Sequence, residues 1–225
     1  MLVISLQTRP SGCRSFFSLC ANKFHRKVLQ LQEQLADVAF TLDFPMPPGL
    51  PLPEAHLRLD LTCKNARWAI ANRRRRDLPL MAGVQGWNES SYVSCVRNYK
   101  GLGFDGFAIG GLIPRRHDTK LVLAIVEAVK QEIGYKHLHV FGLGHPTVLT
   151  DLYKAGADSV DSSSYVKYAA DGKLWSDPDF HALDPSVTDR LNLALANLAL
   201  ATQRTLPLAT AEAIFATLRG EKSRF

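Results

Sequence analysis

The feature that most constrains the fold is an alternation of short apolar runs with helical segments, between about residues 26 and 164. The apolar runs lack a polar–apolar alternation, which is typical of strands that are covered on both faces. The segments between them repeat apolar residues at the i, i+3 and i+4 spacing of a helix. Because consecutive parallel strands need a crossover connection, this pattern predicts an α/β fold with a parallel sheet.

Five strand–helix units can be counted. The expected strands span residues 37–44, 78–86, 104–112, 138–144 and 158–164, and the expected helices span 26–36, 59–76, 90–103, 118–134 and 146–157. Residues 1–6 could add one strand at most, whereas a complete (β/α)8 barrel needs eight.

After Trp175 the pattern becomes wholly helical. Residues 184–186 (Asp-Pro-Ser) are typical of a helix cap, and residues 187–203 have the pattern of an amphipathic helix. We therefore divide the chain into a poorly defined segment 1–26, a barrel portion 27–175 and a helical segment 176–225.

Each expected strand ends in glycine, a carboxylate or an amide. The residues concerned are Asp43, Gln85, Gly110, Gly111, Gly142, Gly144 and Asp161. Open α/β sheets and barrels both place their ligand sites at the carboxyl ends of parallel strands. A lone glycine in such a place usually marks a turn, but five successive ends of this kind predict a shared site.

Asp43 and Gln85 could bind a flat heterocycle. The Asp43 carboxylate could accept two hydrogen bonds from the donor edge of a purine-like base, and the Gln85 amide could both donate to that base and accept from it. The alternative interpretation is that Asp43, like Asp161, caps a loop, as strand-end acids often do.

The next two strand ends could complete such a site. Gly110, Gly111 and Leu112 offer backbone groups that a flat ligand can approach closely, because glycine has no Cβ. Phe141, followed by Gly142, is expected to stack on the same ligand.

Asp161 is the candidate nucleophile. A carboxylate suits displacement at the anomeric carbon of a sugar, because it stabilises an oxocarbenium-like transition state and can bond to the sugar covalently. The small side chains of Ser162–Ser164 would leave room for a nucleotide. Asp158 lies on the opposite face of the expected strand, so we assign it a structural role.

The chain is basic, with a formal charge of +6 and a pI of about 9.2, which is compatible with a polyanionic partner. The densest cluster consists of Arg73, Arg74, Arg75 and Arg76. This run is either a solvated helix end or a patch that contacts phosphates. Arg115 and Arg116 follow the strand end at Gly111, so we expect them to contact phosphates on the ligand-binding face.

The cysteines predict a reducing compartment, taken here as the cytoplasm. Cys13, Cys20, Cys63 and Cys95 form no CxxC pair and have no metal-ligand spacing, so we expect free thiols and no bound metal. No apolar run approaches the ~20 residues that cross a bilayer. No basic region precedes the first apolar residues, so no signal peptide is expected.

Five stretches together resemble the tRNA-guanine transglycosylase superfamily, which comprises the queuine and archaeosine tRNA-ribosyltransferases. They are LADVAFTLDFPMPPG, MAGVQGWNESSY, LGFDGFAIGGL, HVFGLGHPTVLTDLYKAGADSVDSSS and DGKLW. The resemblance implies an incomplete TIM-type (β/α)8 barrel, equivalent to about strands 4 to 8. It also implies exchange of a guanine in a nucleic acid for a 7-deazaguanine.

The resemblance further implies roles for individual residues. Asp161 is similar to the family's nucleophile, which attacks the ribose C1′ and forms a covalent aspartyl-ribosyl intermediate. Asp43 is similar to the aspartate that binds the base. Its partners would be Gln85, Gly111 and the backbone of Leu112, with Phe141 in a base-stacking position.

The chain also departs from the family pattern. No SGGF-type strand end, which carries the family's general acid/base aspartate, precedes the Asp43 strand, and the first three barrel strands are not recognisable. No cysteine follows Cys95, so the family's zinc site is absent and no cofactor is expected. The stretch SSSYVKY replaces the family's Pro-Thr-Arg type motif, which fits a branch that inserts 7-deazaguanines into DNA.

We therefore expect a base-exchange transglycosylase whose partners are a nucleic acid, either DNA or tRNA, and a free 7-deazaguanine base. The alternative is a catalytically inactive fragment or subunit that only binds base or nucleic acid. In either case a second chain could complete the barrel. A third interpretation is a different (β/α) enzyme whose strand ends mimic the family pattern.

Overall fold

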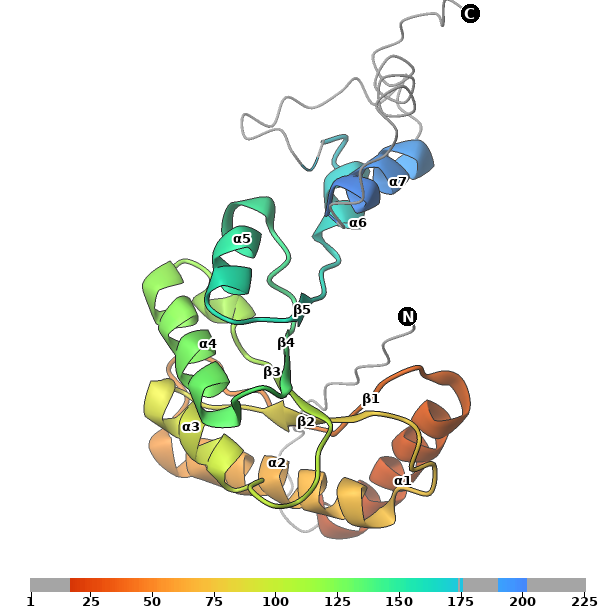
Figure 1. Ribbon diagram of the computed structural model, residues 1–225, viewed down its shortest axis with the longest axis vertical. Coiled ribbons are helices and arrows are strands. Elements are labelled where there is room, and N and C mark those ends of the chain that lie inside the picture. The colour runs from red at the N-terminus through yellow and green to blue at the C-terminus, as the bar shows by residue number, and fades with distance from the viewer. Residues whose placement is uncertain (1–16, 174, 176–189, 202–225) are drawn as a thin grey trace, which may run out of the picture. The chain divides into compact units, whose positions relative to one another are not determined.

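The computed structural model describes residues 17–173, 175 and 190–201 (Figure 1). These residues form two compact units, which we describe separately. The first contains the described residues up to 143 together with 151–160, and the second contains 144–150 together with the described residues from 161 onward. The expected strand 1–6 and the expected cap 184–186 lie outside the described residues. The three segments proposed from the sequence stay predictions.

The first unit is built on a sheet of five parallel strands. They are β1 (Ala39–Phe40), β2 (Leu80–Val84), β3 (Gly106–Ile109), β4 (His137–Val140) and β5 (Ser159–Val160), and they lie in the order β1-β2-β3-β4-β5. Because each strand pairs with the next one along the chain, the order never reverses as it does in a doubly wound sheet. The sheet is part of a TIM-type barrel, which confirms the predicted fold class.

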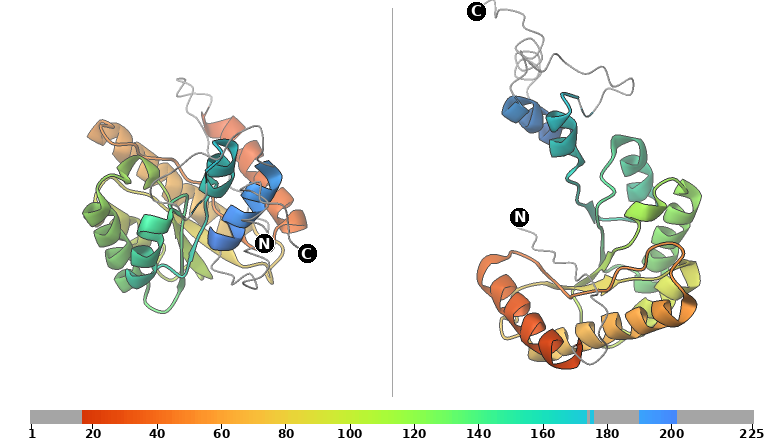
Figure 2. Two further views of the ribbon diagram at one scale, coloured as in Figure 1. Left: turned by 90° about the horizontal axis from the view of Figure 1, so that it is seen from above. Right: turned by 180° about the vertical axis from the view of Figure 1, so that it is seen from behind.

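Helices connect the strands along one side of the sheet. They are α2 (Leu52–Asn72), α3 (Glu89–Arg97), and the 3₁₀ turn η1 (Ile113–Arg115) with α4 (Thr119–Ile133), whereas α1 (Phe17–Leu35) precedes β1. Figures 1 and 2 show α2, α3 and α4 on the same side of the strands. The start of α3 is fixed by a capping box, in which Asn88 and Ser91 each accept a hydrogen bond from the other's backbone N–H.

Helix α2 differs from the expected helix at both ends. It begins at Leu52 rather than at residue 59, because Pro53 fits the first turn, where its missing N–H would have no helical partner. It ends at Asn72, since Arg73 adopts an extended conformation with ψ of 133°. The four arginines therefore follow the helix instead of forming its last turn.

The strands are buried on both faces, as their unbroken apolar runs predict. Every residue of β2 and β3 is buried. On one face Phe40, Met81 and Ala108 form a cluster that Val38 and Phe141 extend. The side chains of α4 that cover the sheet are apolar, so the core lies between the sheet and its helices.

The second unit contains a helix pair. Helix α6 (Ser164–Ala170), which the sequence did not predict, packs on α7 (Arg190–Ala201), which lies within the expected helix 187–203. The fully buried Asn197 joins them, because its side chain accepts from the Trp175 N–H and donates to the carbonyl oxygens of Tyr165 and Lys173.

Helix α5 (Pro146–Lys154) has residues in both units. Within the described part of the chain, no helix combines the length and apolar character needed to cross a lipid bilayer.

Candidate functional site

The structure brings Asp43 and Gln85 into direct contact. Gln85 directly follows β2, and its amide Nε2 donates to the Asp43 carboxylate Oδ2 at 2.5 Å. Gln85 is fully buried and Asp43 is 9% exposed. Among the described residues, no group donates a hydrogen bond to Oε1 of Gln85. A buried acceptor without a donor costs free energy, so a donor that reached Oε1 would stabilise this pair.

Burial also changes the chemistry of the Asp43 carboxyl. Removal from water raises the pKa of Asp43 above its usual range, and the hydrogen bond from Gln85 opposes part of that shift. A buried carboxylate gains when a ligand supplies further N–H donors, because each new hydrogen bond stabilises its charge.

The segment that carries Asp43 leaves the sheet just beyond β1. Pro45 excludes a further ladder bond, and the segment is held to α2 instead. The Phe44 N–H donates to Oγ1 of Thr62 at 3.0 Å, and Nδ2 of Asn65 donates to the Leu42 carbonyl at 3.1 Å. These bonds hold the Asp43 side chain beside Gln85.

Gly110 and Gly111 pack directly against this pair. A Cβ on Gly110 would collide with Nε2 of Gln85, and a Cβ on Gly111 would lie 2.5 Å from Oε1 of the same amide. Gly111 has a φ of +74°, in the region that favours glycine. The strand end must therefore be glycine for the Gln85 amide to lie where it does. Leu112, the next residue, is fully buried.

The side chains of Tyr92 and Arg115 bind these glycines, and only Arg115 was among the candidates from the sequence. The Tyr92 hydroxyl donates to the Gly110 carbonyl at 2.8 Å. The Arg115 guanidinium donates to the Gly111 carbonyl at 2.6 Å, and Arg115 is only 7% exposed. Arg115 was expected to contact a phosphate, whereas the structure turns it inward. Tyr92 has an apolar helical spacing on α3, so only the tertiary contact distinguishes it from a core residue.

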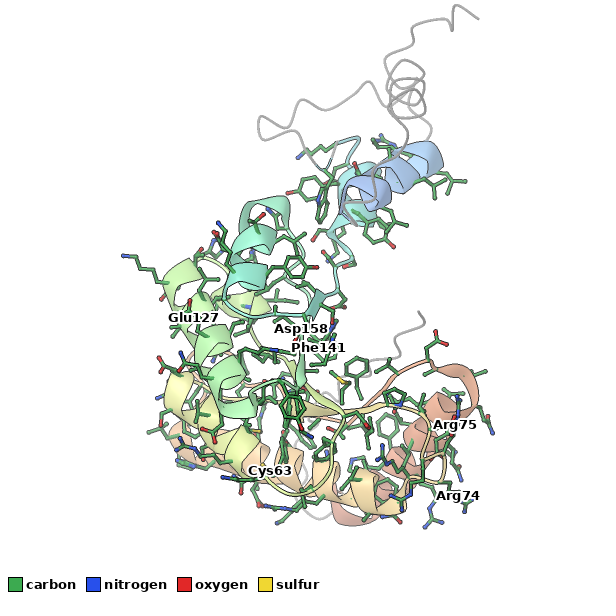
Figure 3. All side chains as sticks on the ribbon, viewed as in Figure 1. Cys63, Arg74, Arg75, Glu127, Phe141 and Asp158 are labelled. Atoms are coloured by element: carbon green, nitrogen blue, oxygen red, sulfur yellow. The ribbon has the colours of Figure 1, made fainter. Side chains whose placement is uncertain are left out.

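Phe141 lies among aromatic rings at the end of β4 (Figure 3). Its ring centroid is 5.1 Å from that of Phe40 and 4.7 Å from that of His139. Gly142 follows with a φ of +77°, and a Cβ there would collide with Ile113. The half-buried Phe141 therefore offers an aromatic surface next to the Phe40–Met81–Ala108 cluster.

The two carboxylates near β5 have different surroundings. Asp158, labelled in Figure 3, accepts hydrogen bonds from Nζ of Lys130 and from the Leu138 N–H, both at 2.8 Å. These contacts tie β5 to α4 and β4, which supports a structural role for Asp158. Asp161 directly follows β5 and begins the part of the second unit that leads into α6.

The run Arg73–Arg76 lies near the amino ends of the strands, opposite to the base-binding candidates. Its loop joins α2 to the amino end of β2, whereas Asp43, Gln85 and Gly110 follow the carboxyl ends of strands. Figure 3 shows Arg74 and Arg75 beside α1, where their backbone N–H groups donate to Glu33. Arg73 pairs with Asp105 at 2.9 Å, and Arg75 pairs with Asp77 at 3.2 Å. The structure therefore does not bring this run together with the base-binding candidates.

A groove of about 500 Å³ is formed by the loops that follow β1, β2 and β3. Its walls are Pro47, Pro48, Gly49, Leu50, Leu52, Trp87, Pro114, Arg115, His117, Asp118 and Leu121. Arg116, which lies in the loop that follows β3, is exposed. The groove is large enough for a nucleotide-sized group.

Within the described residues, no group of three or more His, Cys, Asp or Glu side chains is placed to hold a metal ion. Cys63 and Cys95 are buried thiols.

Comparison with known proteins identifies relatives of the chain. A model of the family described as queuine tRNA-ribosyltransferase matches residues 21–208. The protein named tRNA-guanine(15) transglycosylase of Pyrococcus furiosus is 31% identical over 175 residues, which cover 74% of this chain and 28% of that protein. The proteins of the same name from Pyrobaculum aerophilum and Methanococcus aeolicus are 31% and 29% identical, over 66% and 65% of this chain. The chain thus spans roughly a quarter to a third of the length of these relatives.

Proposed function

Because the chain belongs to the queuine tRNA-ribosyltransferase family, we propose that it takes part in base exchange, in which a guanine of a nucleic acid is replaced by a 7-deazaguanine. The observation that carries this proposal is the buried Asp43–Gln85 pair, whose carboxylate and open amide oxygen face two glycines. Such a site fits a flat, donor-rich base edge.

Guanine and 7-deazaguanines present that edge. Their N1–H and exocyclic amine donate in the same direction, so the Asp43 carboxylate could accept from both. Oε1 of Gln85 is a further acceptor for the amine. The backbone N–H groups of Gly111 and Leu112 are the donors that we assign to the carbonyl oxygen of the base. Phe141 would stack on the ring.

In the proposed reaction, Asp161 is the nucleophile. A carboxylate oxygen of Asp161 attacks C1′ of the ribose while the C1′–N9 bond breaks, and the guanine leaves with the bonding electron pair and takes up a proton. The incoming 7-deazaguanine then attacks C1′ through its ring nitrogen, loses the proton from that nitrogen and displaces the carboxylate. The backbone of the polymer is unchanged by the exchange, because the same C1′ carries a base before and after it.

The relatives' names favour tRNA as the polymer, since each is called a tRNA-guanine(15) transglycosylase. DNA is the alternative suggested by the SSSYVKY stretch. For phosphate contacts we propose Arg116, which is exposed near the groove. Arg115 is already bound to Gly111, and Arg73–Arg76 would contact a more distant part of the polymer.

A second candidate function is binding without turnover. The absence of an SGGF-type acid/base strand end from this sequence favours it, because loss of a positioned acid or base typically costs ~10²–10⁴ in rate. A further chain could then supply the remaining strands. Within the described sheet, β1 and β5 each pair with one strand only, and such edges can add another strand.

The test is exchange of labelled base. The protein is incubated with radiolabelled guanine or 7-cyano-7-deazaguanine and, separately, with tRNA and with duplex DNA. Asp161→Asn removes the nucleophile, and Asp151→Asn is the matched control, since it makes the same charge change at a side chain that pairs with Lys154 at 3.7 Å. Incorporation that Asp161→Asn abolishes and Asp151→Asn retains supports the proposed function. Guanine binding without incorporation supports the second candidate, and light scattering then tests for a further chain.

A further inference from the structure

We propose that Tyr92 and Arg115 are positioning residues for base recognition, because they orient the two peptide groups that follow β3. This inference rests on the proposed function, since the ligand of those peptide groups is the base. Neither side chain needs to touch the base. Each would act through the backbone of Gly110 or Gly111.

The geometry assigns one carbonyl to each side chain. The Tyr92 hydroxyl donates to the Gly110 carbonyl at 2.8 Å, and the Arg115 guanidinium donates to the Gly111 carbonyl at 2.6 Å. In a trans peptide the N–H points opposite to the C=O. Fixing these two carbonyls therefore fixes the N–H groups of Gly111 and Leu112, which point away from Tyr92 and Arg115.

Those two N–H groups lie just beyond the sheet ladder, and Leu112 is fully buried. In the described part of the chain, no protein acceptor bonds to the N–H of Gly111 or Leu112. The preceding N–H, that of Gly110, still donates to Val84 in the sheet at 3.0 Å. The chain thus leaves its ladder at Gly111, and two consecutive donors without a protein acceptor follow beside the buried Gln85 oxygen, which lacks a donor.

Glycine alone would not hold this arrangement. Gly110 and Gly111 have more conformational freedom than other residues, and Gly111 already has a positive φ of +74°. Two buried side-chain donors remove that freedom. Burial of an arginine guanidinium is unfavourable unless hydrogen bonds compensate for the lost water. Arg115 is only 7% exposed and donates to a backbone carbonyl, which indicates a specific role.

Tyr92 is also coupled to Gln85 through Gly111. A Cβ on Gly111 would lie 2.5 Å from Oε1 of Gln85 and 3.1 Å from the Tyr92 hydroxyl oxygen, so both groups converge on one backbone position. Burial raises the pKa of Tyr92, although the Arg115 charge opposes the shift, so the phenol stays protonated. The Tyr92 hydroxyl therefore stays a donor at physiological pH.

The chain offers a matched control for Tyr92. Tyr99 is likewise buried at the α3 side of the sheet, and its hydroxyl donates to the Gly83 carbonyl at 2.9 Å. Tyr92→Phe and Tyr99→Phe each remove one hydrogen bond to a backbone carbonyl without changing the ring, and Tyr99→Phe also removes the bond that the hydroxyl oxygen accepts from Cys95 Sγ at 3.4 Å. If the Tyr92 hydroxyl only stabilised the fold, Tyr92→Phe and Tyr99→Phe would have similar effects on residues 110–112 and on guanine binding.

The first measurement is amide hydrogen exchange of the unliganded protein. We expect Tyr92→Phe to raise the exchange rate of residues 110–112 about tenfold, whereas Tyr99→Phe leaves that stretch at the wild-type rate. The second is guanine binding by calorimetry, where Tyr92→Phe should raise the Kd about tenfold and Tyr99→Phe should not change it.

Arg115 gives an independent test. Arg115→Met should weaken guanine binding, and Arg115→Lys should restore part of it, because lysine can still donate to the Gly111 carbonyl. Arg97→Met is the control, since Arg97 is exposed and its side chain pairs with Glu132 at 3.0 Å. If Tyr92→Phe does not fold, the Arg115 variants still test whether the Gly111 carbonyl must be held in place for guanine to bind.

Two failures are distinguishable. If wild-type protein does not bind guanine, the proposed function is wrong, and exchange at residues 110–112 still decides whether Tyr92 and Arg115 position the backbone. Equal effects of Tyr92→Phe and Tyr99→Phe on exchange, or equal effects of Arg115→Met and Arg97→Met, would overturn the positioning roles.

Discussion

Replacement of Gly111 with alanine tests the site geometry most directly. At a φ of +74°, alanine costs about 1–2 kcal/mol relative to glycine. Its Cβ would also lie 2.5 Å from Oε1 of Gln85, which is fully buried and cannot turn toward solvent. The amide must therefore shift, and its hydrogen bond to the Asp43 carboxylate, worth about 1.5–3 kcal/mol, would be strained or lost.

The sum predicts that Gly111→Ala lowers the free energy of unfolding by about 3–5 kcal/mol. Gly101 provides the control, because its φ is +78° and a Cβ there would have no described neighbour within 4 Å. Gly101→Ala should therefore cost only the backbone term of about 1–2 kcal/mol.

Urea denaturation measures both free energies, and calorimetry measures guanine binding by the folded variants. We expect Gly111→Ala to abolish detectable binding at guanine concentrations that saturate wild-type protein, whereas Gly101→Ala binds normally. Equal destabilisation by the two substitutions would refute the packing argument. Wild-type guanine affinity in Gly111→Ala would refute the placement of the base beside Gln85.

Three further outcomes are expected. Burial raises the pKa of Asp43 above its unfolded value, so its contribution to stability is present at low pH and is lost as pH rises through the folded pKa. Asp43→Asn should therefore raise the free energy of unfolding at pH 7 while it abolishes guanine binding. Partial burial alone would raise the pKa of Asp158, but the Leu138 N–H and the Lys130 ammonium hold it below its usual value. Asp158→Asn should lower stability at pH 7, and the difference should vanish as pH falls through the folded pKa. Arg116→Gln should reduce the slope of log affinity for tRNA against log salt by about 1.

Each outcome has a contrary result. A less stable Asp43→Asn protein at pH 7 would mean that the carboxylate is stabilised by contacts other than that with Gln85. A stability difference for Asp158→Asn that persists at low pH would point to packing rather than charge. For the salt slope, Arg97→Gln is the control, because Arg97 is already paired with Glu132. Equal slopes for the two arginine variants would exclude a specific contact by Arg116.

The parallel sheet could be predicted from the sequence because the apolar runs that indicate its strands are a local feature. The uninterrupted apolar runs of β2 and β3 imply strands that are covered on both faces, and both strands are buried throughout. The contact of Gln85 with Asp43 was also within reach, since both follow strands that the alternation places side by side. The start of α2 was missed because the proline-rich loop masks a helix that tolerates Pro53 in its first turn.

Other features depended on contacts between distant residues. Arg115 and Arg116 are adjacent in sequence, yet one is buried against Gly111 and the other is exposed. The run Arg73–Arg76 was expected to meet phosphates, and only the direction of β2 shows that its loop lies at the amino edge of the sheet.

By itself, the sequence determined the alternation of five strands with helices and the chemical groups that follow each strand, because apolar periodicity and residue type are local properties. Tertiary structure alone decided which of those groups meet. Parallel register sets Ala39 opposite Leu80 and Met81 opposite Gly106, and it thereby brings Asp43, Gln85 and the glycines to one edge. It also made Tyr92 a donor to Gly110, since a hydroxyl on a helix finds its acceptor only when the helix packs on the sheet.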